Sequence, residues 1–101
     1  MYPFNRDQII TGLNNLNDTL VKLLAGRGNE EQTDPKMLEF RVKALKQVLM
    51  QVDNSLGELH DMLDTLEYHK DERYEEAAAV VRALEDNTAQ VVEYLRSLGK
   101  Y

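Results

Sequence analysis

Apolar residues recur along most of the chain at alternating steps of four and three, the spacing of helices that pack through one apolar seam. The longest run comprises Leu38, Val42, Leu45, Leu49, Val52, Leu56, Leu59, Leu63 and Leu66. Gly57 lies inside this run without shifting its phase. Asp34 can cap the helix, and Pro35 suits the first helical position. The run predicts one continuous helix over residues 35–68, about 50 Å long at 1.5 Å per residue.

A shorter seam precedes this helix. Asn5 can cap its beginning, and Gly26 and Gly28 can end it, because glycine tolerates the left-handed conformation that closes a helix. The seam residues are Ile9, Leu13, Leu16, Leu20 and Leu23. We therefore expect a helix over about residues 5–25 and a loop over residues 26–34.

A third seam predicts a helix over about residues 72–98, ended by Gly99. Its members are Tyr74, Ala77, Val81, Leu84, Thr88, Val91, Leu95 and Leu98. These positions are displaced by one residue from the register of the second helix, so a straight continuation would turn half of the stripe away. The displacement favours a turn in residues 67–73 and an antiparallel helical hairpin.

The sequence thus predicts an all-α fold: a single helical domain over residues 1–101, built as an antiparallel hairpin with a shorter third helix. We expect a coiled-coil-like three-helix bundle that oligomerises. When the helix lengths are counted back from each turn, the first helix is long enough to cover only the first half of the second helix. This leaves the half next to the hairpin turn with two helices.

In that half, residues 77–84 are apolar nearly all round the predicted third helix. Their small side chains would let a second copy approach closely. We therefore expect a homo-oligomer interface at Ala79, Val80, Ala83 and Asn87. The alternative is that Ala79 and Ala83 are exposed helix formers that need no partner.

The charge is distributed unevenly. The chain has 101 residues with 18 acidic and 12 basic side chains, a net charge of -6. Residues 51–86 hold eleven acidic and three basic side chains, whereas Lys36, Arg41, Lys43 and Lys46 gather near the start of the second helix. We expect Asp61, Asp64, Asp71 and Glu75 to bind a partner with a basic surface. The alternative is a solvated surface that keeps a leucine-rich bundle soluble.

Few residues suggest catalysis or metal binding. The chain has no cysteine, which excludes disulfides and thiol chemistry. Neither His60 nor His69 follows a glutamate by three residues, as in the ligand pair of di-iron bundles. We expect no cofactor and no metal. The beginning of the chain lacks a signal-peptide pattern and no segment reaches the ~18 apolar residues of a membrane span, so we expect a soluble, cytoplasmic protein.

These patterns favour a non-enzymatic protein–protein interaction module, an adaptor, assembly chaperone or inhibitor, that acts through helix faces. Its expected partners are a protein and its own copies, with neither nucleic acid nor membrane. A second hypothesis is a small acidic inhibitor of phage or mobile-element type that mimics nucleic acid and blocks a nucleic-acid-binding enzyme. Salt separates the two, because charge-driven binding weakens steeply with ionic strength. An enzyme would need a deep pocket that a thin bundle rarely provides.

Overall fold

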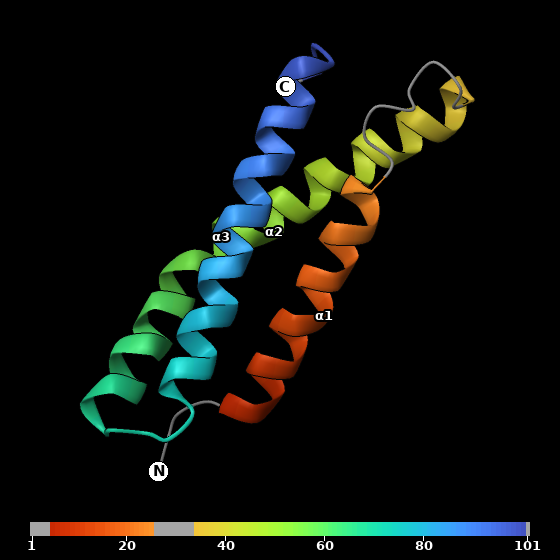
Figure 1. Cartoon of the computed structure of the whole chain (residues 1–101). Helices are drawn as coiled ribbons and strands as arrows, with labels where there is room; N and C mark the ends of the chain where they lie inside the picture. The colour runs from red at the N-terminus through yellow and green to blue at the C-terminus, as the bar shows by residue number, and fades with distance from the viewer. Residues whose placement is uncertain (1–4, 26–33, 101) are drawn as a thin grey trace.

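The computed structural model describes residues 5–25 and 34–100, and these form three helices (Figure 1). They are α1 (Arg6–Leu24), α2 (Pro35–Tyr68) and α3 (Tyr74–Ser97). No strand occurs in these two ranges, so the prediction of an all-helical chain with three helices is confirmed for them. The predicted stop at Gly26 and Gly28 and the loop over residues 26–33 lie outside the described residues.

Two of the helices begin at side-chain caps. The Asn5 side chain accepts a hydrogen bond of 3.2 Å from the backbone N–H of Gln8. The Asp34 carboxylate accepts one of 2.8 Å from the backbone N–H of Lys36, and Pro35 follows at the first helical position. Each cap satisfies a backbone donor that has no partner within its helix.

The same backbone motif ends α2 and α3. After α3, the Lys100 N–H bonds to the Leu95 carbonyl at 2.9 Å, and Gly99 has a φ of 70°. After α2, the Asp71 N–H bonds to the Leu66 carbonyl at 2.9 Å, and Lys70 has a φ of 52°. This arrangement is typical of a left-handed helix end, where glycine is the usual residue. Because Lys70 takes that place, the turn carries no glycine signal in the sequence.

The core runs between the facing sides of the three helices. Its largest fully buried side chains are Ile10, Leu20, Leu45, Val52, Leu66, Val81, Leu84, Val91 and Leu95. At the surface between α2 and α3, His60 Nε2 lies 3.2 Å from Glu85 Oε1. α3 therefore packs against α2, with this contact at their shared surface.

The position of α1 corrects the expectation from helix lengths. The Arg6 guanidinium binds the Asp71 carboxylate, so α1 begins beside the turn between α2 and α3 and not beside the first half of α2 (Figure 1). Ala25 and Asp34 are nine residues apart, a separation that a chain can extend to about 30 Å. The end of α1 is therefore not tied to the start of α2, and long-range contacts decide where α1 lies.

As a result, the first half of α2 extends past the end of α1 (Figure 1). In this half of α2, Met37 and Phe40 are 60% and 69% exposed. The half that contains only two helices is thus the end away from the turn. The molecule is 50 Å long and less than 20 Å wide, matching the length of α2.

Candidate functional site

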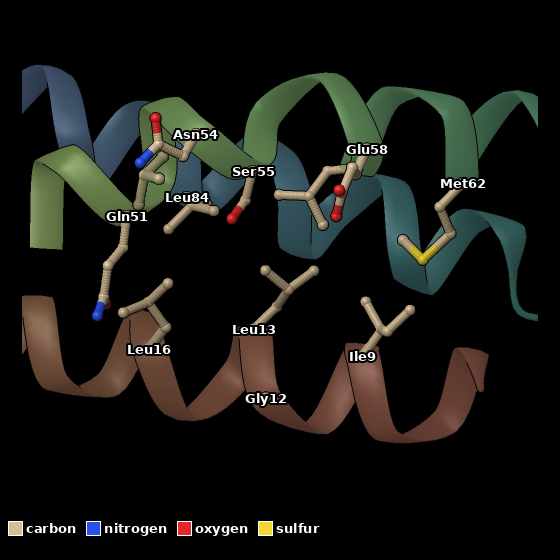
Figure 2. Close-up of a pocket in the computed structure, with 12 residues that line it drawn as sticks. Ile9, Gly12, Leu13, Leu16, Gln51, Asn54, Ser55, Glu58, Met62 and Leu84 are labelled. Atoms are coloured by element: carbon tan, nitrogen blue, oxygen red, sulfur yellow. The ribbon is translucent and has the colours of Figure 1, made fainter. Parts of the chain in front are cut away.

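An apolar groove of about 500 Å³ lies between α1 and α2. Both helices pack mainly on α3 and contact each other little, so their facing sides diverge. Figure 2 shows α1 and α2 on opposite sides of this groove with α3 behind it. Its lining residues are Ile9, Gly12, Leu13, Leu16, Gln51, Val52, Asn54, Ser55, Glu58, Leu59, Met62 and Leu84.

The groove has an apolar floor and a polar edge. Leu13, Met62 and Leu84 are 7%, 3% and 0% exposed and belong to the core. From α1, Ile9 and Leu16 point toward α2, and they are only partly buried (Figure 2). The α2 side of the edge carries Gln51, Asn54, Ser55 and Glu58. Among these described lining residues Glu58 is the one acid and no base accompanies it, so the groove suits apolar side chains rather than acid–base catalysis.

Gly12 lies at the α1 edge of the groove. A Cβ placed there would meet no atom within 4 Å, so the chain's own packing does not require a glycine. Inside a helix glycine is about 1 kcal/mol less favourable than alanine. Its missing side chain leaves room for an external group to approach the α1 backbone closely. The sequence analysis missed this groove, although a glycine in the interior of α1 was a visible signal.

The four carboxylates expected to bind a partner do not share one environment. Asp61, Asp64 and Glu75 are exposed. The Asp71 side chain is 1% exposed, binds the Arg6 guanidinium and accepts a 2.8 Å hydrogen bond from the Arg73 N–H. Asp71 therefore holds α1 to the turn, and its carboxylate does not face a partner.

Arg73 forms a second link between α1 and the turn. Its guanidinium binds Glu76 of α3 at 2.9 Å and also binds Asp7 of α1. These hydrogen bonds, with Glu76 first and Asp7 second, raise the pKa of Arg73 above its ordinary value. An arginine is protonated throughout the physiological pH range, so both contacts of Arg73 are ion pairs.

The expected oligomer face is partly covered by α1 of the same chain. Val80 is 8% exposed, and its carbonyl accepts a 3.2 Å hydrogen bond from the Asn17 side chain. The Asn87 side chain donates one of 3.1 Å to Asn17. Ala79 and Ala83 are exposed. The reason for placing a second copy there, a missing third helix, therefore does not hold.

The histidines take part in surface contacts. The side chains of His60 and Glu85 are 58% and 45% exposed. His69 packs edge-on against the Tyr68 ring, with 5.2 Å between ring centroids. Within residues 5–25 and 34–100, no three histidine, cysteine or acidic side chains come together as metal ligands.

No protein-family model matches the sequence, and neither the curated proteins nor the solved structures include a significant match to the chain. In the described part of the chain, no helix combines the length and apolar character needed to cross a bilayer.

Proposed function

We propose that this chain is a non-enzymatic module that binds a helix of a protein partner in the groove between α1 and α2. The observation that carries the proposal is the open apolar groove itself, which α3 closes on its far side. With an antiparallel α2–α3 hairpin and α1 beside α3, an incoming helix would complete a four-helix arrangement. A module of this kind could serve as an adaptor, an assembly chaperone or an inhibitor.

The chemistry of the groove fits an amphipathic helix. Ile9, Leu16 and the core residues beneath them would pack against the apolar face of that helix, at roughly 1.5–3 kcal/mol for each large apolar side chain that becomes fully buried. Gln51 and Ser55 at the edge could hydrogen-bond polar groups that flank this face. Recognition of this kind reads apolar residues at helical spacing.

The proposal is tested by placing the photo-cross-linking residue benzoylphenylalanine at Gln51 of the full chain, an exposed residue that lines the groove. The control carries it at Gly57 on the same helix, which does not line the groove and has no atom within 4 Å of an added Cβ. Irradiation in native cell extract should give an adduct of defined mass with a polypeptide from position 51 and not from position 57. Circular dichroism verifies that both variants are folded. Absence of any polypeptide adduct from position 51 would contradict the proposal.

A second candidate, mimicry of nucleic acid, draws on the exposed carboxylates. Asp61, Asp64 and Glu75 are accessible to a basic partner, whereas Asp71 is not. If this surface binds a basic cleft, affinity should fall steeply with salt, and Asp61→Lys with Asp64→Lys should slow association. Binding that changes little with salt would favour the groove.

A further inference from the structure

The first part of α2, residues 35–48, is called the arm, because it extends past the end of α1. One face of the arm continues into the groove. Residues spaced by four or three positions share one face of a helix. On this face of α2 they form one stripe, which comprises Phe40, Ala44, Val48, Gln51, Ser55, Glu58 and Met62. The outer part of the stripe is open, since Phe40 is 69% exposed, and Met37 beside it is 60% exposed. The inner part forms the α2 wall of the groove.

The charge of α2 reverses along the same direction. The arm carries the four basic residues Lys36, Arg41, Lys43 and Lys46 and the single acid Glu39. Residues 53–67 carry five acids, Asp53, Glu58, Asp61, Asp64 and Glu67, and no base. A helix with one basic and one acidic half complements its own copy when the two lie antiparallel.

We propose that the helix bound in the groove is the arm of a second copy of this chain. The two α2 helices would lie antiparallel about a two-fold axis, each arm filling the groove of the other copy. This inference rests on the proposed function and names its partner. Each site is incomplete alone, because the groove supplies a floor and the arm supplies the apolar side chains that cover it. The contact is self-complementary, as a two-fold interface requires.

The helical spacing gives the register. With the axis near residue 49, Phe40 of one copy lies opposite Glu58 and Ser55 of the other, close to Gly12. The absent side chain of Gly12 leaves space for the ring of Phe40. Contacts from residue 37 to residue 61 would extend about 36 Å along the two helices at 1.5 Å per residue.

The same register pairs opposite charges. Lys43 lies seven residues after Lys36 and 18 residues before Asp61. Both separations are close to whole numbers of turns at 3.6 residues per turn, so the three residues lie on the same side of α2. Around a two-fold axis between antiparallel helices, equivalent sides face each other. Lys36 of each copy therefore lies opposite Asp61 of the other, and Lys43 approaches Glu58.

The first test replaces Phe40 by Glu in the full chain and measures sedimentation equilibrium over a range of concentrations. Tyr68→Glu is the matched control, because Tyr68 is also an exposed aromatic residue, 82% exposed, and lies outside the stripe. The unaltered chain and Tyr68→Glu should form dimers. Phe40→Glu should weaken the dimer about 30-fold or more, as for a large aromatic side chain that the interface buries, and keep its helical content. A monomeric unaltered chain, or an unaffected Phe40→Glu dimer, overturns the inference.

The second test uses charge reversal and mixing. One variant carries Lys36→Glu and Lys43→Glu in the arm, and the other carries Glu58→Lys and Asp61→Lys beside the groove. In a dimer of either variant alone, like charges would face each other at both contacts between an arm and a groove. Each variant alone should therefore dimerise more weakly than the unaltered chain. An equimolar mixture should form the mixed dimer with restored affinity, because both contacts then pair opposite charges. A mixture as weak as the separate variants overturns the antiparallel arrangement.

The cross-link from position 51 distinguishes failure of this inference from failure of the proposed function. An adduct of twice the chain mass supports the second copy as the occupant. An adduct with a different protein only would overturn the self-association and leave the helix-binding role of the groove standing. No polypeptide adduct from position 51 would overturn both.

Discussion

Asn87 on α3 donates a 3.1 Å hydrogen bond to the side chain of Asn17 on α1, which in turn donates one of 3.2 Å to the Val80 carbonyl. These two bonds connect residues 70 and 63 positions apart in the chain. Polar side chains within an otherwise apolar contact restrict the register of two helices, because sliding would leave them without partners. The pair therefore fixes where α1 lies along α3, and so sets the position of the groove.

Replacing Asn17 by Ala should destabilise the fold by about 1–2 kcal/mol relative to Asn14→Ala. Asn14 is exposed on the same helix, so this control cancels the gain in helix propensity. Urea unfolding followed by circular dichroism measures both. Equal stabilities of the two variants would mean that the polar contact does not hold α1 in place.

Asp71→Asn should cost about 2 kcal/mol of stability. The amide can still cap the Arg73 N–H, so the loss reports the charge-assisted bonds to Arg6. The control is Glu72→Gln, which removes a neighbouring exposed charge and should change stability by less than about 0.5 kcal/mol. Thermal and urea unfolding provide the comparison, and a neutral Asp71→Asn would contradict the structural role of this carboxylate.

Gly12→Ala should raise the free energy of unfolding by about 0.5–1 kcal/mol, and Gly57→Ala should do the same. In both places the added methyl group meets no atom of the chain and the helix gains propensity. Chemical denaturation in dilute solution is the measurement. A destabilised Gly12→Ala would show that α1 and α2 approach each other more closely than the groove allows.

Leu84→Ala should cost about 3 kcal/mol, because Leu84 is 0% exposed and forms part of the groove floor. Phe40→Ala removes a larger side chain but should cost less than about 1 kcal/mol in dilute solution, since that ring is 69% exposed. The two urea midpoints give the comparison. Similar losses would mean that the arm is packed within a single chain.

The apolar seams in the sequence were sufficient to predict the three helices. The four-three spacing from Leu38 to Leu66 lies within α2, which runs from Pro35 to Tyr68 in the structure. The shift in the phase of the apolar positions before Tyr74 lies next to the turn. Both signals come from residues close together in the chain. The turn itself was less visible, because Lys70 adopts the left-handed conformation that glycine usually provides.

The candidate site could not be predicted from such local patterns. Asp61, Asp64 and Asp71 are alike in sequence, yet only Asp71 meets Arg6, which lies 65 positions away, and becomes buried. Val80 looked uncovered because the helix that covers it was assigned to the other end of the hairpin. Counting residues between turns gives a helix its length but not its place when the connection is long.

The sequence by itself determined that the chain forms helices, where those helices run and which side of each is apolar, because periodicity is a local property of the backbone geometry. Only the tertiary structure decided which apolar sides cover each other. Asn17 holds α1 along α3, and the Arg6–Asp71 contact holds the start of α1 at the turn, both through residues more than 60 positions apart. This choice leaves α1 and α2 apart, opens the groove and exposes the arm, because no short-range pattern specifies which of several similar apolar seams a helix will join.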